Sequence, residues 1–196
     1  MKFFERLRLY DKIARISEIG RRYFVMNSFD GVLTIIGILV GAYFSGIATP
    51  YTIIFTGISA SIAMAISGIW GTFLTEEAER KKKMNELSRH TLRDMGLTKI
   101  GKAQRMASVV VSLIDGLAPF LSSFIVILPF FFTTYLGIKG AYLLSIVIAL
   151  CLLVLLGGFL GHISKENKFT SGLKMLLAGI VCVVIIFLIG LGHKTL

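Results

Sequence analysis

Residues 23–46, YFVMNSFDGVLTIIGILVGAYFSG, carry one charged side chain, Asp30, in a run that is otherwise uncharged and largely apolar. A helix of this length, rising about 1.5 Å per residue, can cross the hydrocarbon core of a bilayer. Placing a carboxylate at that depth costs about 2.5–3.5 kcal/mol on insertion scales, so Asp30 needs a partner, a wet cavity or a function. We expect a functional carboxylate, with a structural hydrogen bond to Asn27, Thr34 or another helix as the alternative.

The composition of the whole chain repeats the character of this segment. Its 196 residues are 55% apolar with a mean hydropathy of +0.81, which is too apolar for a soluble domain. The second apolar segment is expected to continue as one helix into a long connection, because residues 72–95 contain neither glycine nor proline. The sequence predicts an all-α polytopic membrane protein with five transmembrane helices, at about 23–46, 52–74, 107–136, 141–161 and 173–192.

The positive charges predict the orientation. Seven Lys and Arg residues lie in residues 1–22, nine lie in the connection 75–106, and the net charge is +10. The positive-inside rule then places the N-terminus and the long connections in the cytoplasm and the C-terminus outside. We expect residues 1–22 to form an amphipathic helix at the cytoplasmic interface, ahead of a membrane domain 23–196. The basic face should attract anionic lipid headgroups, whereas nucleic acid is not expected.

A second carboxylate, Asp115, sits at a matching depth of the third apolar segment, and glycine follows it as it follows Asp30. Pro119 cannot donate a hydrogen bond to the Asp115 carbonyl, so a kink is expected there. We predict that the kink turns Asp115 toward the same cavity as Asp30, where two coupled carboxylates would exchange protons for metal. The alternative is a buried kink with Asp115 hydrogen-bonded to a neighbouring helix.

Small and polar residues recur every three or four positions along one face of each of the first three segments. Close helix packing is the favoured explanation for the small residues, although it does not explain the carboxylates. Three such faces turned together would instead make a wet or metal-lined path. The faces are Asn27, Asp30, Thr34, Gly37 and Gly41; Gly57, Ser61, Met64, Gly68, Gly71 and Thr75; and Ser108, Ser112, Asp115, Pro119 and Ser122.

The cytoplasmic connection 75–106 contains two pairs of opposite charge at i,i+4 spacing, Glu76 with Arg80 and Glu79 with Lys83, which is typical of a solvated helix. Gly96 should stop this helix and Thr98 should cap the next one. A metal-loading face is one interpretation of the acidic side chains, because oxygen and imidazole ligands suit a transition metal. A solvated face is the alternative. The candidate ligands are Glu79, Glu86, His90 and Asp94.

Three stretches together resemble the vacuolar iron transporter (VIT) family. Residues 28–46, SFDGVLTIIGILVGAYFSG, are similar to its Asp-Gly-rich first helix. Residues 61–79, SIAMAISGIWGTFLTEEAE, are similar to its second helix, which has a methionine and acidic residues where it leaves the membrane. Residues 171–190, SGLKMLLAGIVCVVIIFLIG, are similar to its last helix. Five spans and a cytoplasmic N-terminus also agree with that family.

The resemblance implies a homodimer that moves Fe²⁺ or Mn²⁺ out of the cytosol in exchange for protons, with no permanently bound cofactor and no enzymatic activity. It matches Asp30 and Met64 to the carboxylate and thioether of the ion path. Two departures stand out: residues 66–69 lack the glutamate usual after the methionine, and the cytoplasmic metal-binding region is short and net basic. The alternative is a non-transporting membrane scaffold whose basic face binds anionic lipid or a partner protein. Either reading places the chain in the cytoplasmic membrane or an organelle membrane.

Overall fold

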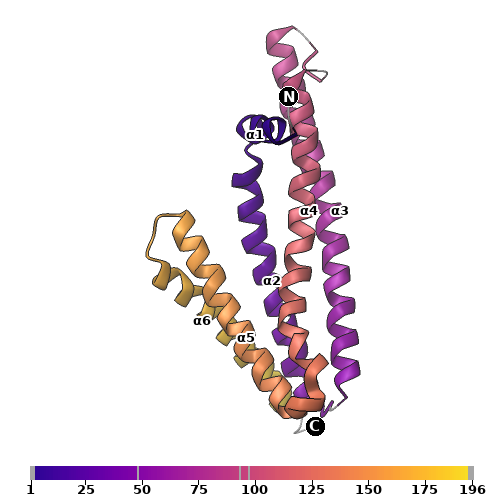
Figure 1. Ribbon diagram of the computed structural model, residues 1–196, viewed down its shortest axis with the longest axis vertical. Helices are drawn as coiled ribbons and strands as arrows, with labels where there is room; N and C mark the ends of the chain where they lie inside the picture. The colour runs from indigo at the N-terminus through magenta and orange to yellow at the C-terminus, as the bar shows by residue number, and fades with distance from the viewer. Residues whose placement is uncertain (1–2, 48, 93, 97, 194–196) are drawn as a thin grey trace. The chain divides into compact units, whose positions relative to one another are not determined.

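The computed structural model describes residues 3–47, 49–92, 94–96 and 98–193, and this part of the chain is all-α (Figure 1). The long helices follow from uninterrupted apolar runs with few breakers. The elements are α1 (Phe3–Ala14), α2 (Ile16–Phe44), α3 (Pro50–Thr91), α4 (Lys99–Ile127), the 3₁₀ helix η1 (Leu128–Phe132), α5 (Thr133–Ile163) and α6 (Lys168–His193).

Four helical stretches in the described residues are long and apolar enough to cross a membrane: Ile16–Phe44, Pro50–Thr91, Lys99–Ile163 and Lys168–Gly190. The chain is therefore an all-α membrane protein, as the sequence predicts. The third stretch is 65 residues long and contains both α4 and α5. A count of five crossings, with the N-terminus in the cytoplasm, stays a prediction.

The chain divides into two compact units that share three helices. The first unit is Met1–Phe24 with Ala65–Ala118, and the second is Val25–Met64 with Pro119–Leu196.

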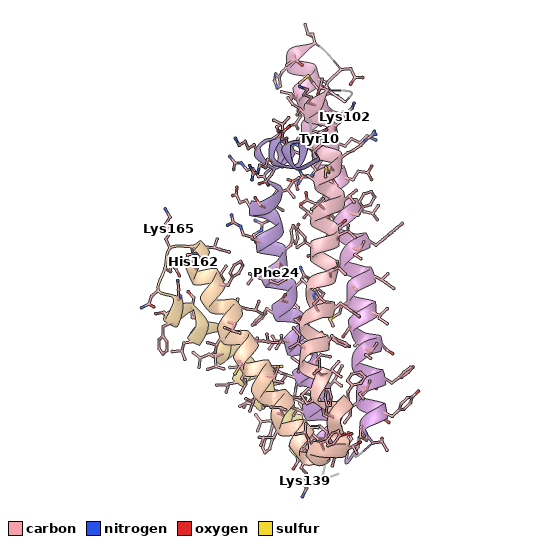
Figure 2. All side chains as sticks on the ribbon, in the orientation of Figure 1. Tyr10, Phe24, Lys102, Lys139, His162 and Lys165 are labelled. Atoms are coloured by element: carbon pink, nitrogen blue, oxygen red, sulfur yellow. The ribbon has the colours of Figure 1, made fainter. Side chains whose placement is uncertain are left out.

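The break between α4 and α5 comes earlier than predicted. The sequence suggests a turn after residue 136, but the α-helical hydrogen bonding of α4 ends at Ile127 and η1 follows, with Pro129 near its start. The backbone then leaves helical geometry at Gly137, with φ 66° and ψ 163°, a conformation that glycine adopts at little cost. Figure 2 shows Lys139 near one end of α5, and His162 and Lys165 at the other end.

The core of the second unit is built from aliphatic side chains of α2, α3, α4 and α5 together with the aromatic rings of Phe130 in η1 and Tyr142 in α5. Ile35, Ile36 and Leu39 are fully buried there. At the end of α2, the Tyr142 hydroxyl donates a hydrogen bond to the Ile47 carbonyl, with 3.0 Å between the oxygens. Lipid is as apolar as these side chains, so their fit to one another, rather than exclusion from water, stabilises the contact.

The predicted N-terminal amphipathic helix is interrupted at Arg15, which has φ 51° and separates α1 from α2. Ala14 and Ile16 flank the break, and both are buried in a small core of the first unit with residues of α4. Figure 2 labels Tyr10 on α1 and Lys102 on α4, two members of this unit. The segment 1–22 therefore contains all of α1 and the first seven residues of α2.

Helix α3 confirms the prediction of one helix running from the second apolar segment into the connection, since it continues unbroken to Thr91. It ends at Thr91, five residues before Gly96, so the glycine does not stop it directly. Thr98 caps α4 as expected, because its hydroxyl oxygen accepts a hydrogen bond from the Gly101 N–H at 3.3 Å.

Asp11 fixes the beginning of α2. Its carboxylate accepts hydrogen bonds from the Ser17 backbone N–H at 2.7 Å and from the Ser17 hydroxyl at 2.7 Å. These bonds, with a smaller contribution from the Arg21 charge, hold the pKa of Asp11 below its usual 3.8. The stabilisation is therefore fully present above pH 3.8 and is lost as the pH falls through the lower folded-state pKa.

We predict that Asp11→Ala speeds hydrogen exchange at the Ser17 amide about fivefold at neutral pH, which corresponds to about 1 kcal/mol for a lost cap. In the unmodified chain, acidification should reproduce this loss of protection, after correction for intrinsic exchange rates. Hydrogen exchange followed by mass spectrometry checks both. Equal protection at Ser17 in the two proteins would contradict the capping role.

Helices α5 and α6 approach closely at Gly157. A Cβ atom added there would lie 2.5 Å from the Ser171 carbonyl oxygen and 2.7 Å from the Gly172 Cα atom. The neighbouring Gly158 offers a control, because its nearest atom, the Lys168 carbonyl oxygen, would be 3.9 Å away. We predict that Gly157→Ala lowers the free energy of unfolding by about 1–3 kcal/mol, whereas Gly158→Ala leaves it unchanged or slightly higher. Unfolding by denaturing detergent measures both, and equal effects would show that the contact is loose.

Candidate functional site

Asp30 lies on an exposed face of α2 within the second unit. The Thr34 hydroxyl, proposed as a structural partner, donates instead to the Asp30 backbone carbonyl at 2.8 Å. Within the described residues the Asp30 carboxylate itself has no hydrogen bond or ion pair. A carboxylate held in an apolar helix without a partner among the described residues is the most unusual polar group of this unit.

The opposite face of α2 is fixed against the second half of α4, and this fixes the direction of Asp30. The Ser122 hydroxyl donates to the Ser28 carbonyl at 3.1 Å, and the Ser123 hydroxyl donates to the Gly31 carbonyl at 3.1 Å. A Cβ atom at Gly31 would lie 2.7 Å from the Pro119 carbonyl oxygen. The glycine after Asp30 therefore permits close backbone packing, while the carboxylate points away from that contact.

Other members of the predicted small-residue faces divide into packed and open positions. In the second unit, Gly57 would collide with the Ile127 side chain if it carried a Cβ atom, whereas a Cβ atom at Gly41 would meet nothing within 4 Å. Gly41 lies eleven residues after Asp30, about three helical turns along the same face. Met64, the predicted soft ligand, is half-buried on α3. Among the described residues, the face of α2 that contains Asp30 is thus packed against other helices over only part of its length.

Asp115 has a different environment in the first unit, where it is only 4% exposed. The Thr72 hydroxyl of α3 donates a hydrogen bond to the Asp115 carboxylate oxygen Oδ2. The next residue, Gly116, packs against the α3 backbone: a Cβ atom there would lie 2.9 Å from the Ile69 amide nitrogen and closer still to the Ala65 carbonyl. This arrangement matches the alternative of a hydrogen bond to a neighbouring helix. Asp30 belongs to the other unit, so coupling between the two carboxylates stays a prediction.

The predicted kink at Pro119 also stays a prediction. Helix α4 is continuous from Lys99 to Ile127, with Pro119 inside it. The boundary between the two units falls between Ala118 and Pro119. The Pro119 carbonyl accepts a hydrogen bond from the Ser122 hydroxyl at 3.1 Å, which is a local interaction within α4.

The Glu76–Arg80 pair corrects the prediction of a solvated helix. Its side chains are 10% and 8% exposed, and Arg80 Nη2 lies 2.7 Å from Glu76 Oε2. Arg80 Nη1 also donates to the Gln104 side-chain oxygen on α4, and the Tyr23 hydroxyl of α2 donates to Glu76 Oε1 at 3.5 Å. The second pair, Glu79 with Lys83, is 63% and 65% exposed, as expected. Three helices of the first unit therefore meet at one buried ion pair.

Sequence reasoning missed this network because it assigned the wrong residues to the inner face of α3. The predicted face continues from Gly68 through Gly71 and Thr75, yet both of these are exposed. The buried polar residues follow Gly68 at steps of four instead. That spacing could have identified the α3 members, although the contacts from Tyr23 and Gln104 depend on the fold. The buried positions are Thr72, Glu76 and Arg80.

The four candidate cytoplasmic ligands are all exposed. Glu79 pairs with Lys83 at 2.9 Å, and Asp94 accepts a hydrogen bond from the Gly96 N–H at 2.8 Å. Among the described residues, no three His, Cys, Asp or Glu side chains stand close enough together to hold a metal ion. The set of Glu79, Glu86, His90 and Asp94 is thus not a preformed cluster in one chain, and a loading role stays a prediction.

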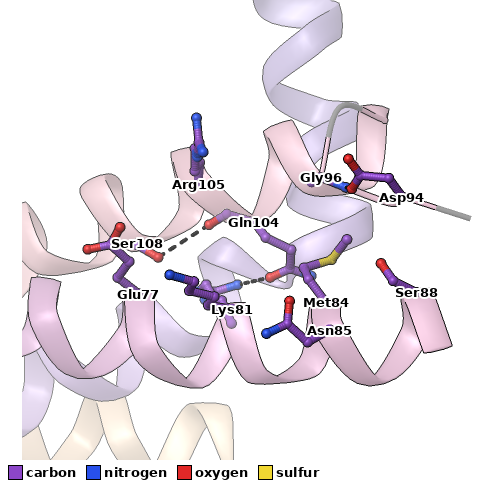
Figure 3. Close-up of a pocket in the computed structure, with 12 residues that line it drawn as sticks. Glu77, Lys81, Met84, Asn85, Ser88, Asp94, Gly96, Gln104, Arg105 and Ser108 are labelled. Carbon is purple, nitrogen blue, oxygen red and sulfur yellow. Dashed lines mark hydrogen bonds between the residues drawn. The ribbon is translucent and has the colours of Figure 1, made fainter.

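A cavity of about 260 Å³ lies between α3 and α4 in the first unit (Figure 3). Its lining combines both charge signs with neutral polar groups, and Met84 contributes a thioether. In Figure 3 the Arg105 side chain points away from the residues of α3. Because the lining side chains carry both charges and belong to no single chemical type, the cavity does not indicate a particular class of bound molecule. The labelled lining residues are Glu77, Lys81, Met84, Asn85, Ser88, Asp94, Gly96, Gln104, Arg105 and Ser108.

We predict that Thr72→Val lowers the free energy of unfolding by about 1–3 kcal/mol, because it leaves the buried Asp115 carboxylate without this donor. Thr75→Val is the matched control, since the Thr75 hydroxyl is exposed and donates only to carbonyls of its own helix, such as Gly71 at 2.9 Å. Detergent unfolding of the two purified variants gives the comparison. Equal stability of the two would show that the Thr72–Asp115 bond contributes nothing measurable.

The chain is similar to an archaeal protein over most of its length. No family model matches the chain. The chain is 34% identical over 175 residues to the uncharacterized protein MJ0645 of Methanocaldococcus jannaschii, and the match covers 88% of this chain and 89% of the relative. The aligned region includes almost all of both proteins, so the likeness is one of whole chains. The chain therefore belongs to the same family as the archaeal protein MJ0645.

Proposed function

We propose that the protein is a homodimeric transporter that moves a divalent transition metal, Fe²⁺ or Mn²⁺, out of the cytosol in exchange for protons. The observation that supports this proposal most strongly is the exposed carboxylate of Asp30 on an apolar helix. An ionised group in contact with lipid is costly, so this face needs contacts that the described residues of one chain do not supply.

We propose that a second copy of the chain packs against the Asp30 face of α2. The open space beside Gly41, on the same face as Asp30, leaves room for a helix from another chain to approach closely. Two copies related by a two-fold axis would bring two Asp30 carboxylates to one interface. Such a pair can bind a divalent cation or share a proton, and the exchange of one for the other is the chemistry that an antiporter needs.

The choice of metal rests on the predicted ligand set. Met64 would add a soft thioether to the Asp30 oxygens, and soft ligands favour Fe²⁺ over Mg²⁺ or Ca²⁺. Asp115 would act as a proton relay, and the four acidic and imidazole side chains of the cytoplasmic part of α3 and its loop would load the ion. The resemblance to the VIT family supports this assignment, together with five crossings, a cytoplasmic N-terminus and a C-terminus outside.

A membrane scaffold is the second candidate, and the burial of Asp115 favours it. That carboxylate is already used as a hydrogen-bond acceptor between α3 and α4. If Asp30 were likewise covered by a partner protein, the chain would need no transport activity. The two candidates differ in whether the purified protein moves metal.

We predict that wild-type protein in liposomes moves Fe²⁺ or Mn²⁺ and changes the internal pH in the opposite sense, and that Asp30→Asn reduces both signals to the level of empty liposomes. The substitution keeps the side-chain size and removes the charge. A metal-sensitive dye and a pH dye measure the two fluxes. Glu18→Gln is the control, because Glu18 lies near the start of the same helix, and its side chain is 65% exposed.

Size-exclusion chromatography must show that Asp30→Asn retains the wild-type oligomeric state. Wild-type flux in that variant would exclude Asp30 as the ion site. Absence of flux from the wild-type protein, with either metal and with a pH gradient, would favour the scaffold.

A further inference from the structure

A second cavity in the first unit, about 350 Å³ in volume, lies where α1 and the start of α2 meet α3 and α4. The side formed by α1 and α2 combines apolar residues with two arginines, Arg15 and Arg22, and the side formed by α3 carries charged residues of both signs. This size is at the lower end of the range for small-ligand sites, about 300–1,000 Å³. The lining residues are Ile13, Ala14, Arg15, Ile19, Arg22, Glu76, Glu79, Arg80, Lys83 and Gln104.

The charged lining has an excess of positive groups, with four basic and two acidic side chains. Both acids already have a basic partner on α3: Glu76 lies 2.7 Å from Arg80, and Glu79 lies 2.9 Å from Lys83. The remaining basic residues are Arg15 and Arg22. A cation would therefore be repelled, whereas an anion would meet Arg15 and Arg22, neither of which forms an ion pair with a carboxylate of the lining among the described residues.

The contacts that Arg15 and Arg22 make within the protein are weak and leave both guanidinium groups able to bind an anion. Arg15 Nη1 lies 3.8 Å from Glu18 Oε2, but both side chains are largely exposed, at 75% and 65%, so this ion pair is weak. The Arg22 guanidinium carbon lies 5.7 Å from the centre of the Tyr23 ring, a contact that orients the side chain without neutralising it.

The floor of the cavity is buried and hydrogen-bonded. Arg80 is almost fully buried, and its Nε atom donates to Glu76 Oε2 at 2.8 Å while Nη1 donates to the Gln104 side chain. The rim is fixed as well, because Arg15 occupies the break between α1 and α2 and Asp11 caps the start of α2. The buried floor and the backbone of the rim are therefore in place before binding, and the side chains that a ligand would have to order are those of Arg15 and Arg22.

We propose that this cavity binds a phosphate group, with Arg15 and Arg22 as its main contacts. Guanidinium groups present several N–H donors in a plane and suit the oxygens of phosphate better than a point charge does. The phosphate belongs either to a lipid, whose acyl chains would meet the apolar residues of α1 and α2, or to a soluble phosphate compound. This site goes beyond the transport proposal and does not depend on it.

Two arms of one experiment separate the two sources. Full-length protein in detergent is titrated with inorganic phosphate by calorimetry, and the same preparation is examined by native mass spectrometry with phosphatidic acid against phosphatidylcholine. Arg22→Gln should weaken binding about five- to tenfold in whichever arm shows it, as expected for a lost charge-assisted bond. Added salt should also weaken binding.

Two further variants keep the test specific. Arg21→Gln changes an exposed arginine next along α2 that does not line the cavity, and it should leave binding unchanged. Glu79→Gln frees Lys83 and should tighten binding about threefold, a gain that damage to the fold would not produce. Binding of phosphate in the first arm identifies a soluble ligand, and selective binding of phosphatidic acid in the second identifies a lipid. Binding in neither arm, or equal losses in Arg22→Gln and Arg21→Gln, would overturn the proposal.

Discussion

The close approach of α3 to α4 at Gly116 is the constraint on which the first unit depends. Without a side chain at this position, the two backbones come near enough for the Thr72 hydroxyl to reach Asp115. Farther along the same pair of helices, Arg80 on α3 reaches Gln104 on α4. Each of these polar groups would be expensive to bury alone, so the helix contact and the hydrogen bonds require one another.

The two Asp-Gly pairs show that the same dipeptide can have two different roles. In both, the glycine lies in a tight backbone contact, Gly31 against Pro119 and Gly116 against Ala65 and Ile69. The carboxylates differ, because Asp115 is turned into its contact and Asp30 away from it. The glycine therefore supplies packing in each case, and only the exposed carboxylate is left for another molecule.

The sequence predicted the helical class, the apolar segments and the long α3, because these follow from composition and the spacing of breakers along the chain. It also predicted the Thr98 cap, which is a local signal. It placed the end of α4 too late, since apolar residues continue through η1 and Gly137 without a change in hydropathy. It treated Glu76 and Arg80 as solvated because i,i+4 spacing is the same for a buried and an exposed pair. Only the contacts from Tyr23 and Gln104, distant in sequence, separate the two cases.

The difference between the Glu76–Arg80 pair and the Asp115 site has a consequence for assembly in the membrane. Glu76 and Arg80 lie one turn apart on the same helix, so they neutralise each other as soon as α3 forms. Asp115 depends on Thr72, which belongs to another helix. Because α3 precedes α4 in the chain, the helix that carries the donor is synthesised before the helix that carries the carboxylate. This order suits a chain whose N-terminal parts fold first, since the Thr72 hydroxyl is then available when α4 packs against α3.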